Sequence, residues 1–401
     1  MIDFENARLA FLKAFAPLGH VRVPLGDAAG RRCATTIAAP HDWPMFDNSA
    51  MDGYAIDPSS NIDESTAFEV VAEVAAGQTK LPTVGRGQAA RVFTGAPMPI
   101  GTDTVVMQEY SRREGTSVRF TESVKRGQHV RRRGNDISEG QTLLEPSTLL
   151  GPAELSVLAS MNLPSVHLFR RPSVAILSTG DELQSLGRDL GAFQVIDSNR
   201  YAISAALRGL AEPAIEYVRV PDSLTKTIDA IERCHEHDLV ISVGGASVGD
   251  HDHVGAALDA LGFERLVDGI ALKPGKPTML ARLGKTLFVG LPGNPVSALV
   301  VFEAFVRPAL ESMLGNTGAP VRRWARARGD IGHRPGRVEL VRGRLEHEEA
   351  GFRFNAVADQ NSGALSSLLG VNALGLIPRD SEGLRSGEEL EVLPFNDPSG
   401  F

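Results

Sequence analysis

The stretch Ser173-Val-Ala-Ile-Leu-Ser-Thr-Gly-Asp-Glu182 passes from an apolar run directly into small hydroxyl, glycine and acidic residues. A short apolar run bounded by a turn signal is typical of a strand that is buried on both faces. The same pattern recurs where Leu239–Val243 and Leu287–Leu291 enter glycine-containing loops. Helical segments over Asn199–Leu210 and Thr225–His237 separate these strands, so the sequence predicts an open, mainly parallel α/β sheet.

The loops that follow these strands carry polar residues. In open α/β sheets ligands bind beyond the carboxyl ends of the strands, so we expect the active cleft at this edge. The loop Ser178–Glu182 combines backbone N–H groups, hydroxyls and two carboxylates, which suits a phosphate ligand with bound magnesium. An ordinary strand-to-helix turn with an acidic cap explains the same residues equally well.

The loop Gly244-Gly-Ala-Ser-Val-Gly-Asp-His-Asp252 is more informative. Its glycines permit close backbone approach, and Ser247, Asp250 and Asp252 can face the same ligand, which favours a functional role. The loop lacks the Gly-Lys-Ser/Thr of an ATP-binding P-loop and the glycine spacing of a dinucleotide-binding fold. The neighbouring histidines have no distant metal-ligating partners in the pattern, so we assign no zinc site.

Two further loops are candidates for anion binding. Lys273-Pro-Gly-Lys276-Pro places two cations on a backbone stiffened by prolines, which suits an oxyanion or a pyrophosphate. Pro292-Gly-Asn-Pro295 opens a helix whose N-terminal N–H groups attract anions. An exposed turn and a structural helix entry are the respective alternatives, and spacing alone does not decide between them.

In the N-terminal half, Phe46–Ala55 clusters polar groups in a largely apolar segment. Asp52 is placed there to reach a metal or a substrate, although local turn hydrogen bonds explain the same residues more simply. Arg131-Arg-Arg-Gly-Asn-Asp136 is a basic cluster in an acidic protein. Phosphate recognition and a solvated face are the two interpretations of that cluster.

The remaining segments indicate several domains, as does the length of 401 residues. Residues 2–18 have the apolar spacing of an amphipathic helix, and residues 152–161 give a second helical signal. Between them, residues 68–144 alternate short β-rich runs with glycine and proline, which predicts a small all-β domain. We expect a domain boundary near residue 170, and a solvated linker at Arg322–Arg328 before a small C-terminal β-barrel.

The composition excludes several classes of function. The 41 Lys and Arg against 49 Asp and Glu give a formal net charge of −8, whereas nucleic-acid binders carry a basic excess. The acidic start and the lack of a long apolar run indicate a cytoplasmic protein with no membrane partner. Cys33 and Cys234, the only cysteines, form no metal-binding or disulfide pattern, and we interpret both as core residues.

Taken in order, these loops resemble the motifs of the molybdopterin molybdotransferases, the family of bacterial MoeA and the gephyrin E domain. The matching stretches also include Thr94–Glu109 and, toward the C-terminus, Val341-Arg-Gly343 and Gln360–Ser367. The resemblance therefore covers almost the whole chain, and its ordered motifs make it specific.

The resemblance implies a multidomain α/β plus β fold. Its parts are an open, mainly parallel α/β molybdopterin-binding domain at residues 171–316, an all-β domain at 56–139, a helical discontinuous domain at 1–55 and 140–170, and a C-terminal β-barrel at 320–401. It also implies a homodimer whose cleft is completed by the partner subunit. Molybdopterin adenylyltransferase and molybdoenzyme maturation factors are the further partners that it suggests.

The reaction that the resemblance implies inserts molybdenum from molybdate into adenylylated molybdopterin and releases AMP, with Mg²⁺ as cofactor. Carried over by motif, the catalytic residues are Asp52, Glu182, Asp222 and Asp252, of which Glu182 and Asp252 are also the metal ligands. The substrate-binding residues are Thr94, Arg131, Asp136, Ser247, Lys273, Lys276, Pro292 and Pro295. Molybdate is expected at Lys273, Arg342 and Ser362.

Two positions depart from the family pattern. The chain has Asn135 where relatives commonly have Glu, and Gly269 where relatives often carry a cation. The second departure predicts an anion pocket with one cation fewer. On that basis, a lysine at position 269 would tighten molybdate binding.

Two other functions compete with this interpretation. The adenylyltransferase that makes the substrate shares the α/β loops but lacks the N-terminal β domain and the Pro44–Ala55 motif. A non-enzymatic, gephyrin-like scaffold has no support in the sequence. Consumption of ATP marks the adenylyltransferase, whereas consumption of molybdate with release of AMP marks the molybdotransferase.

Overall fold

The computed structural model describes residues 1–57, 62, 65–245, 253–318 and 321–395. The chain forms two units, one of Met1–Arg22 with His167–Phe401 and the other of Val23–Val166. The first unit contains an α/β sheet and a barrel, and the second contains a β sheet and a short helix.

A six-stranded sheet lies at the centre of the α/β part. Its strands are β13 (Val174–Thr179), β16 (Ile215–Val220), β17 (Leu239–Val243), β18 (Glu264–Asp268), β20 (Met279–Leu283) and β21 (Thr286–Leu291). They lie in the order β16-β13-β17-β21-β20-β18. The first four are parallel, and β20 and β18 add an antiparallel edge, so the predicted open, mainly parallel sheet is confirmed.

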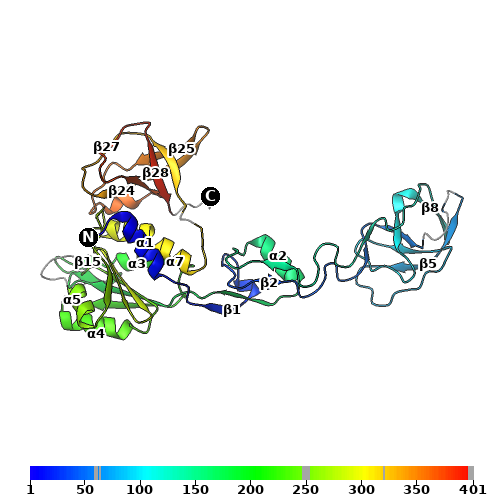
Figure 1. Cartoon of the computed structure of the whole chain (residues 1–401), viewed down its shortest axis with the longest axis horizontal. Coiled ribbons are helices and arrows are strands. Elements are labelled where there is room, and N and C mark those ends of the chain that lie inside the picture. The colour runs from blue at the N-terminus through cyan, green and yellow to red at the C-terminus, as the bar shows by residue number, and fades with distance from the viewer. Residues whose placement is uncertain (58–61, 63–64, 246–252, 319–320, 396–401) are drawn as a thin grey trace. The chain divides into compact units, whose positions relative to one another are not determined.

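Helices cover both faces of this sheet. They are α1 (Phe4–Ala14), α3 (Asn199–Ala206), α4 (Leu224–Cys234), α5 (His253–Ala260), α6 (Pro295–Val301) and α7 (Arg307–Met313), with a π-helical stretch, Phe302–Val306, between the last two. Successive strand residues point to opposite faces, so Val174 and Ile176 pack in one core and Ala175 and Leu177 in another. Figure 1 shows α4 and α5 on one side of the sheet and α1, α3 and α7 on the other.

Helix α1 is shorter than the helix predicted over residues 2–18. Pro17 disfavours helical backbone in the residue before it, which explains the early end. Phe4 and Phe11 pack against Phe305, with ring centroids 5.2 and 5.5 Å apart. The apolar face of α1 is therefore buried within its own unit.

The C-terminal part forms a closed barrel. Its strands are β22 (Arg323–Ala327), β24 (Val338–Glu348), β25 (Gly351–Ala356), β26 (Ala373–Ile377) and β28 (Glu389–Pro394). Pairing runs from β24 through β25, β22, β28 and β26 and returns to β24, which confirms the predicted β-barrel. The short strand β19 (Leu272–Lys273) adds in parallel to the start of β24.

The prediction of a solvated linker at Arg322–Arg328 was wrong, because most of this run is strand β22. Its alanines alternate with its arginines, so Ala325 and Ala327 point into the barrel core. Arg326, which lies between them, is exposed and pairs with Glu389 on the neighbouring strand β28. The high arginine content suggested a solvated segment, although the alternating buried residues are those of a strand.

The second unit is built on another six-stranded sheet, in the order β7-β4-β6-β5-β9-β8. The strands are β4 (Gly53–Ile56), β5 (Ala67–Val74), β6 (Gln88–Val92), β7 (Thr104–Met107), β8 (Ser111–Glu114) and β9 (Ser117–Phe120). This sheet is the predicted all-β part of the fold. Strand β4 pairs with β6 and β7, so the predicted division between residues 55 and 56 falls inside one of its strands.

Short elements complete the two units. The second contains α2 (Pro152–Ser160), β2 (Ile37–Ala38), β3 (Asn48–Ser49), β10 (Val130–Arg131), β11 (Thr142–Leu144) and the 3-10 turns Leu25–Asp27 and Gln108–Tyr110. The first contains β14 (Leu183–Gln184), β15 (Val195–Ile196), β23 (Ile331–Gly332), β27 (Gly383–Leu384) and the 3-10 turn Leu365–Leu368. The chain passes between the units in the paired strands β1 (His20–Pro24) and β12 (Ser165–Phe169).

Two sequence expectations concern the helices and the cysteines. None of the helices in the described residues is both long and apolar enough to cross a bilayer. Cys33 and Cys234 are buried and unpaired, as expected of core residues. Burial raises the pKa of the Cys234 thiol to about 11, so this side chain stays protonated and unreactive at neutral pH.

Asp238, the residue before β17, is hydrogen-bonded to Arg170 and Ser173, which lie just before β13. Its carboxylate accepts two hydrogen bonds from the Arg170 guanidinium, at 2.7 and 2.9 Å, and two from Ser173, both at 2.9 Å. Burial alone would raise the pKa of Asp238, but these hydrogen bonds and the Arg170 charge outweigh it and lower the pKa. The ion pair therefore stabilises the fold at neutral pH.

We predict that Asp238→Ala destabilises the first unit by about 2–3 kcal/mol, because buried donors lose a charged acceptor. Since the folded-state pKa lies below the unfolded value of about 3.9, the stabilisation is complete above that pH and is lost as the pH falls through the folded pKa. Denaturant unfolding at pH 7 and pH 3 measures both effects. The control is Glu389→Ala, which removes an exposed partner of Arg326 and should change stability by less than about 1 kcal/mol. Equal losses of stability in the two variants would contradict the stabilising role of the Asp238 ion pair.

Candidate functional site

A polar pocket of about 750 Å³ lies in the first unit, between the α/β loops and the barrel. Two loops from the α/β part supply one wall and a barrel loop supplies the other. The lining residues are Lys273, Pro274, Gly275, Lys276, Pro277, Pro292, Gly293, Asn294, Ser297, Arg337, Gln360, Asn361 and Ser362. The structure thus brings together Lys273, Lys276, Pro292 and Ser362, which the sequence analysis had assigned to substrate or molybdate.

Local structure explains how these residues converge. Pro292 follows β21 directly, and Pro295 is the first residue of α6, so the loop between them lies where the buried strand becomes a helix. Asn294 donates a hydrogen bond from its side chain to the Ser362 hydroxyl at 3.3 Å, which links this loop to the barrel. Pro295 is not itself among the lining residues.

Cations dominate the pocket. Lys273, Lys276 and Arg337 all line it, and the carboxylate within reach belongs to Glu339, whose Oε1 lies 2.9 Å from the Lys273 Nζ. Lys276 is exposed and has no carboxylate partner among the described residues. Ammonium and guanidinium groups on a stiff backbone are suited to an oxyanion that only accepts hydrogen bonds.

Arg342 does not line this pocket. Its side chain is fully buried, and it donates to the Ser367 hydroxyl at 3.0 Å and to the carbonyls of Asp359 and Asn361 at 3.0 and 3.3 Å. Burial lowers the pKa of Arg342, while the charges of Asp359 and Glu339 oppose that effect. Arg342 therefore acts on the pocket by holding the backbone that carries Asn361.

The geometry also bears on Gly269, the position where relatives often carry a cation. Its φ of +77° lies in the left-handed region, and an added Cβ would be 3.1 Å from Met1 Cγ. A side chain at this position is strained whatever its charge. We therefore no longer expect a lysine there to tighten anion binding.

The carboxyl edge of the α/β sheet holds the predicted acidic residues. Thr179 and Val220 are paired at the ends of β13 and β16, and the loops that follow meet: Asp181 and Asp222 exchange backbone-to-carboxylate hydrogen bonds of 3.3 and 3.4 Å. Glu182 folds back over Gly180, where an added Cβ would be 2.5 Å from Glu182 Oε2.

No cluster of three or more metal-ligating side chains is present in the part of the chain that the structure describes. Ser247 and Asp252, predicted for substrate and metal, lie outside the described residues. Of the two residues predicted to hold Mg²⁺, Glu182 alone lies in the part of the chain that the structure describes.

Three buried acceptors at this edge were missed by the sequence analysis. Thr179 Oγ1, Asn199 Oδ1 and Asn294 Oδ1 are buried and have no hydrogen-bond partner among the described residues. Asn199 also donates to the Gly293 carbonyl at 2.8 Å. The signal available in the sequence was an asparagine at the start of each of two helices that follow the strands.

In the second unit, Asp52 and Thr94 meet. One Asp52 oxygen accepts from the Thr94 backbone N–H at 2.7 Å and from its hydroxyl at 2.9 Å. The backbone hydrogen bond, then the hydroxyl, lowers the pKa of Asp52, so the carboxylate is ionised at neutral pH. The two residues, 42 apart in sequence, were both predicted as site residues.

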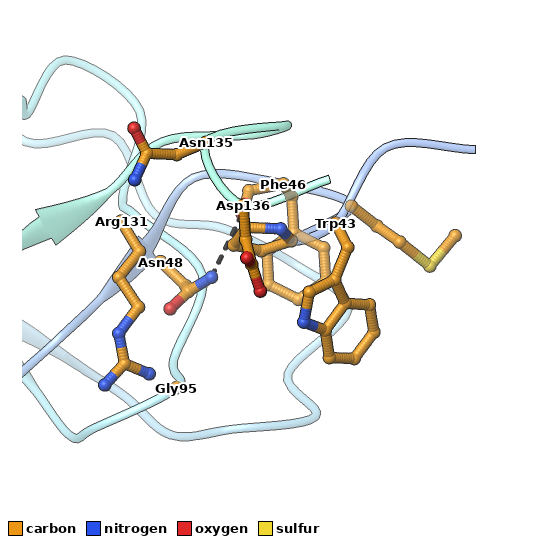
Figure 2. Close-up of a pocket in the computed structure, with 9 residues that line it drawn as sticks. Trp43, Phe46, Asn48, Gly95, Arg131, Asn135 and Asp136 are labelled. Carbon is orange, nitrogen blue, oxygen red and sulfur yellow. Dashed lines mark hydrogen bonds between the residues drawn. The ribbon is translucent and has the colours of Figure 1, made fainter. Parts of the chain in front are cut away.

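A second pocket, of about 630 Å³, lies in this unit and is lined by Trp43, Pro44, Met45, Phe46, Asn48, Gly95, Arg131, Asn135 and Asp136. Figure 2 shows the Arg131 guanidinium on the opposite side of the pocket from the Trp43 ring. Arg132 and Arg133 are neutralised by Asp47 and Asp42, at 2.7 Å in both pairs. Of the basic cluster, Arg131 therefore supplies the cation to the pocket.

Known families match each part of this architecture. Residues 2–162 match the MoeA N-terminal region (domain I and II), residues 175–312 match a probable molybdopterin binding domain, and residues 325–395 match the MoeA C-terminal region (domain IV).

Similar proteins agree along the whole chain. A molybdopterin molybdenumtransferase of Nostoc sp. is 38% identical over 383 residues, which cover 92% of this chain and 88% of the relative. One from Haemophilus influenzae is 35% identical, with 99% of each protein covered. The chain belongs to the MoeA family.

The solved structure of a molybdopterin biosynthesis MoeA protein from Pyrococcus horikosii superposes with a TM-score of 0.87 at 29% identity, covering 99% of this chain and 100% of that one. The multidomain fold inferred from the sequence is thus the MoeA fold. As a member of the MoeA family, the chain is a transferase of molybdenum cofactor biosynthesis.

We predict that Arg342→Met destabilises the barrel by about 2–4 kcal/mol, because the buried Ser367 hydroxyl and two carbonyls lose their donor while the apolar volume is largely kept. Backbone amides near Asn361 should exchange hydrogen faster, whereas amides of the α/β sheet should keep their protection. Thermal unfolding and hydrogen exchange measure these effects. A stable variant with unchanged exchange near Asn361 would show that Arg342 does not hold this loop.

Proposed function

We propose that this MoeA protein binds molybdate in the pocket between the Lys273–Pro277 loop and the barrel, and transfers molybdenum to adenylylated molybdopterin with release of AMP. The observation that carries the proposal is the gathering of Lys273, Lys276 and Arg337 around one polar pocket, beside two serine hydroxyls and three side-chain amides.

The chemistry of molybdate suits these donors. The ion carries two negative charges and only acceptor oxygens, so a binding site must supply hydrogens and positive charge. Lys276 and the N–H bonds of Lys273 not directed at Glu339 supply both, and the start of α6 adds a favourable dipole. The Ser362 hydroxyl gives a neutral donor on the opposite wall.

Magnesium is the proposed cofactor, with Glu182 and Asp252 as the ligands that the resemblance implies; Asp252 lies outside the described residues. When bound, Mg²⁺ polarises the phosphoryl oxygens and stabilises the charge that develops as the phosphoanhydride breaks. Glu182, in the loop that follows β13, would hold the ion at the sheet edge. The buried Asn199 Oδ1 is available to accept from a donor of the pterin, and the Thr179 hydroxyl is available to donate to its phosphate.

Residues of the second unit are proposed to bind the substrate as well. Arg131 and Asp136 offer charges of opposite sign on one pocket, and Asp52 holds Thr94 in place. The adenylyltransferase alternative is not favoured, because the family match covers the N-terminal region as well as the molybdopterin-binding domain. We propose a cytoplasmic location and no nucleic-acid partner, in keeping with the net charge of −8.

The decisive experiment supplies purified protein with adenylylated molybdopterin, Mg²⁺ and molybdate and measures AMP. Lys276→Ala should raise the molybdate concentration for half-maximal activity about ten- to hundredfold, the loss of one charge-assisted contact. The concentration dependence on adenylylated molybdopterin should change much less. Lys285→Ala, which removes an exposed lysine outside the pocket, serves as the matched control. Wild-type protein that releases no AMP would refute the function, and an unchanged molybdate dependence in Lys276→Ala would refute the placement of molybdate.

The proposed homodimer rests on exposed apolar side chains of the second unit. The apolar face of α1 is buried within its own unit, whereas Trp43, Met45 and Phe46 are 38–52% exposed beside the second pocket. Apolar side chains gathered around a pocket are typical of binding surfaces.

We predict that the protein sediments as a dimer at micromolar concentration, twice the chain mass of 42.8 kDa. Phe46→Glu should shift it toward the monomer, because a charge would be buried in an apolar contact. Arg126→Glu, which changes an exposed residue outside this pocket, is the control. A wild-type protein that sediments as a monomer at all concentrations would contradict the dimer.

A further inference from the structure

A buried acid stands behind the cationic pocket and belongs to none of the predicted sites. Glu339 lies near the start of β24, and its side chain is only 5% exposed. Its Oε1 lies 2.9 Å from the Lys273 Nζ, and its Oε2 accepts a hydrogen bond from His333 Nδ1 at 2.8 Å. Both oxygens of the carboxylate are therefore engaged.

The backbone explains why Lys273 and Glu339 meet. Strand β19 pairs in parallel with β24, and the register places Lys273 directly opposite Glu339. The Arg337 guanidinium donates to the Leu272 carbonyl at 3.4 Å beside this pairing. The contact is thus built into the junction of the α/β part with the barrel.

His333 fixes the carboxylate from the other side. Its ring is 1% exposed, so the Nδ1 contact cannot be replaced by water without moving the chain. His333 Nδ1 is the donor in this contact if the Glu339 oxygen accepts, as carboxylate oxygens do. His333 Nε2 is buried and has no partner among the described residues.

The Lys273 side chain differs from its partners in the network because it is 49% exposed and lines the pocket. A free lysine on such a surface samples many rotamers, and fixing its ammonium group lowers its entropy before a ligand arrives. The ammonium has three N–H bonds, of which one is directed to Glu339, and two remain for an anion.

We propose that Glu339 is a positioning residue, which His333 orients and which holds the Lys273 ammonium where it meets the bound oxyanion. This inference rests on the proposed function and adds a residue to the molybdate pocket. Two possible roles for Glu339 predict opposite effects of its removal on anion binding. If Glu339 acted only through its charge, its removal would strengthen anion binding; if it positions Lys273, its removal weakens binding.

The test compares Glu339→Gln and Glu339→Asp with wild type in molybdate-dependent AMP release. The first removes the charge, and the second keeps the charge but shortens the reach. Both should raise the half-saturating molybdate concentration about tenfold, with little change in the concentration dependence on adenylylated molybdopterin. Glu346→Gln, on the same strand and paired with Arg328 away from the pocket, should leave both unchanged.

A double-mutant cycle separates positioning from general damage to the fold. In a Lys273→Ala background, Glu339→Gln should change the half-saturating molybdate concentration by less than about twofold, because the group that it positions is gone. A tenfold effect that persists without Lys273 would overturn the proposal, as would a lower molybdate requirement in Glu339→Gln.

A measurement that does not depend on activity distinguishes the positioning role of Glu339 from the proposed function of the protein. Competitive labelling of amines, followed by mass spectrometry, should show that Lys273 reacts several-fold faster in Glu339→Gln than in wild type. Lys276 lies in the same pocket and is the internal control, with an unchanged rate. Equal labelling of Lys273 in both proteins overturns the positioning role even if AMP is released. Faster labelling of Lys273 in a protein that releases no AMP supports the positioning role and refutes the proposed function. Should Glu339→Gln not fold, Glu339→Asp supplies the same comparison.

Discussion

The parallel pairing of β13, β17 and β21 is the constraint on which the rest of the structure depends. Val243 pairs with Ser178 on one side and Leu291 on the other, so these strands end almost level and their loops emerge together. A slip of one residue would turn every buried side chain to the other face. The loops also approach closely. A Cβ on Gly293 would lie 3.3 Å from the Gly244 Cα, and a Cβ on Gly244, whose φ is +89°, would lie 2.9 Å from Thr179 Oγ1.

The pocket needs a second constraint, because the sheet edge supplies only part of it. The barrel closes when β26 returns to β24, and the same strand β24 pairs with β19 at its start. One continuous strand therefore holds the barrel together and anchors Lys273. Arg342 lies further along β24 and holds the loop that carries Asn361. The two walls of the pocket are thus set by residues on a single strand.

The sequence predicted the features that depend on local pattern. Continuous apolar runs located β13, β17 and β21 closely, and the lysines near prolines marked a loop that lines the cationic pocket. Arg342 shows what a sequence motif does not predict. The motif identifies the residue, but its burial depends on the barrel that forms around its side chain. The contact of Glu339 with Lys273 depends on the register of two distant strands, for which one sequence carries no local signal.

The same distinction between local and global properties makes the proposed binding of molybdate, a dianion, compatible with an acidic protein. The net charge of −8 belongs to the whole chain, but at physiological ionic strength charges are screened beyond about 8 Å. Binding is therefore decided by the groups that line the pocket, where Lys276 and Arg337 outnumber the single acid behind Lys273. That acid removes one unit of attraction, and burial makes it costly to keep. A carboxylate in this place is reasonable only if a fixed ammonium group binds the anion better than a mobile one does.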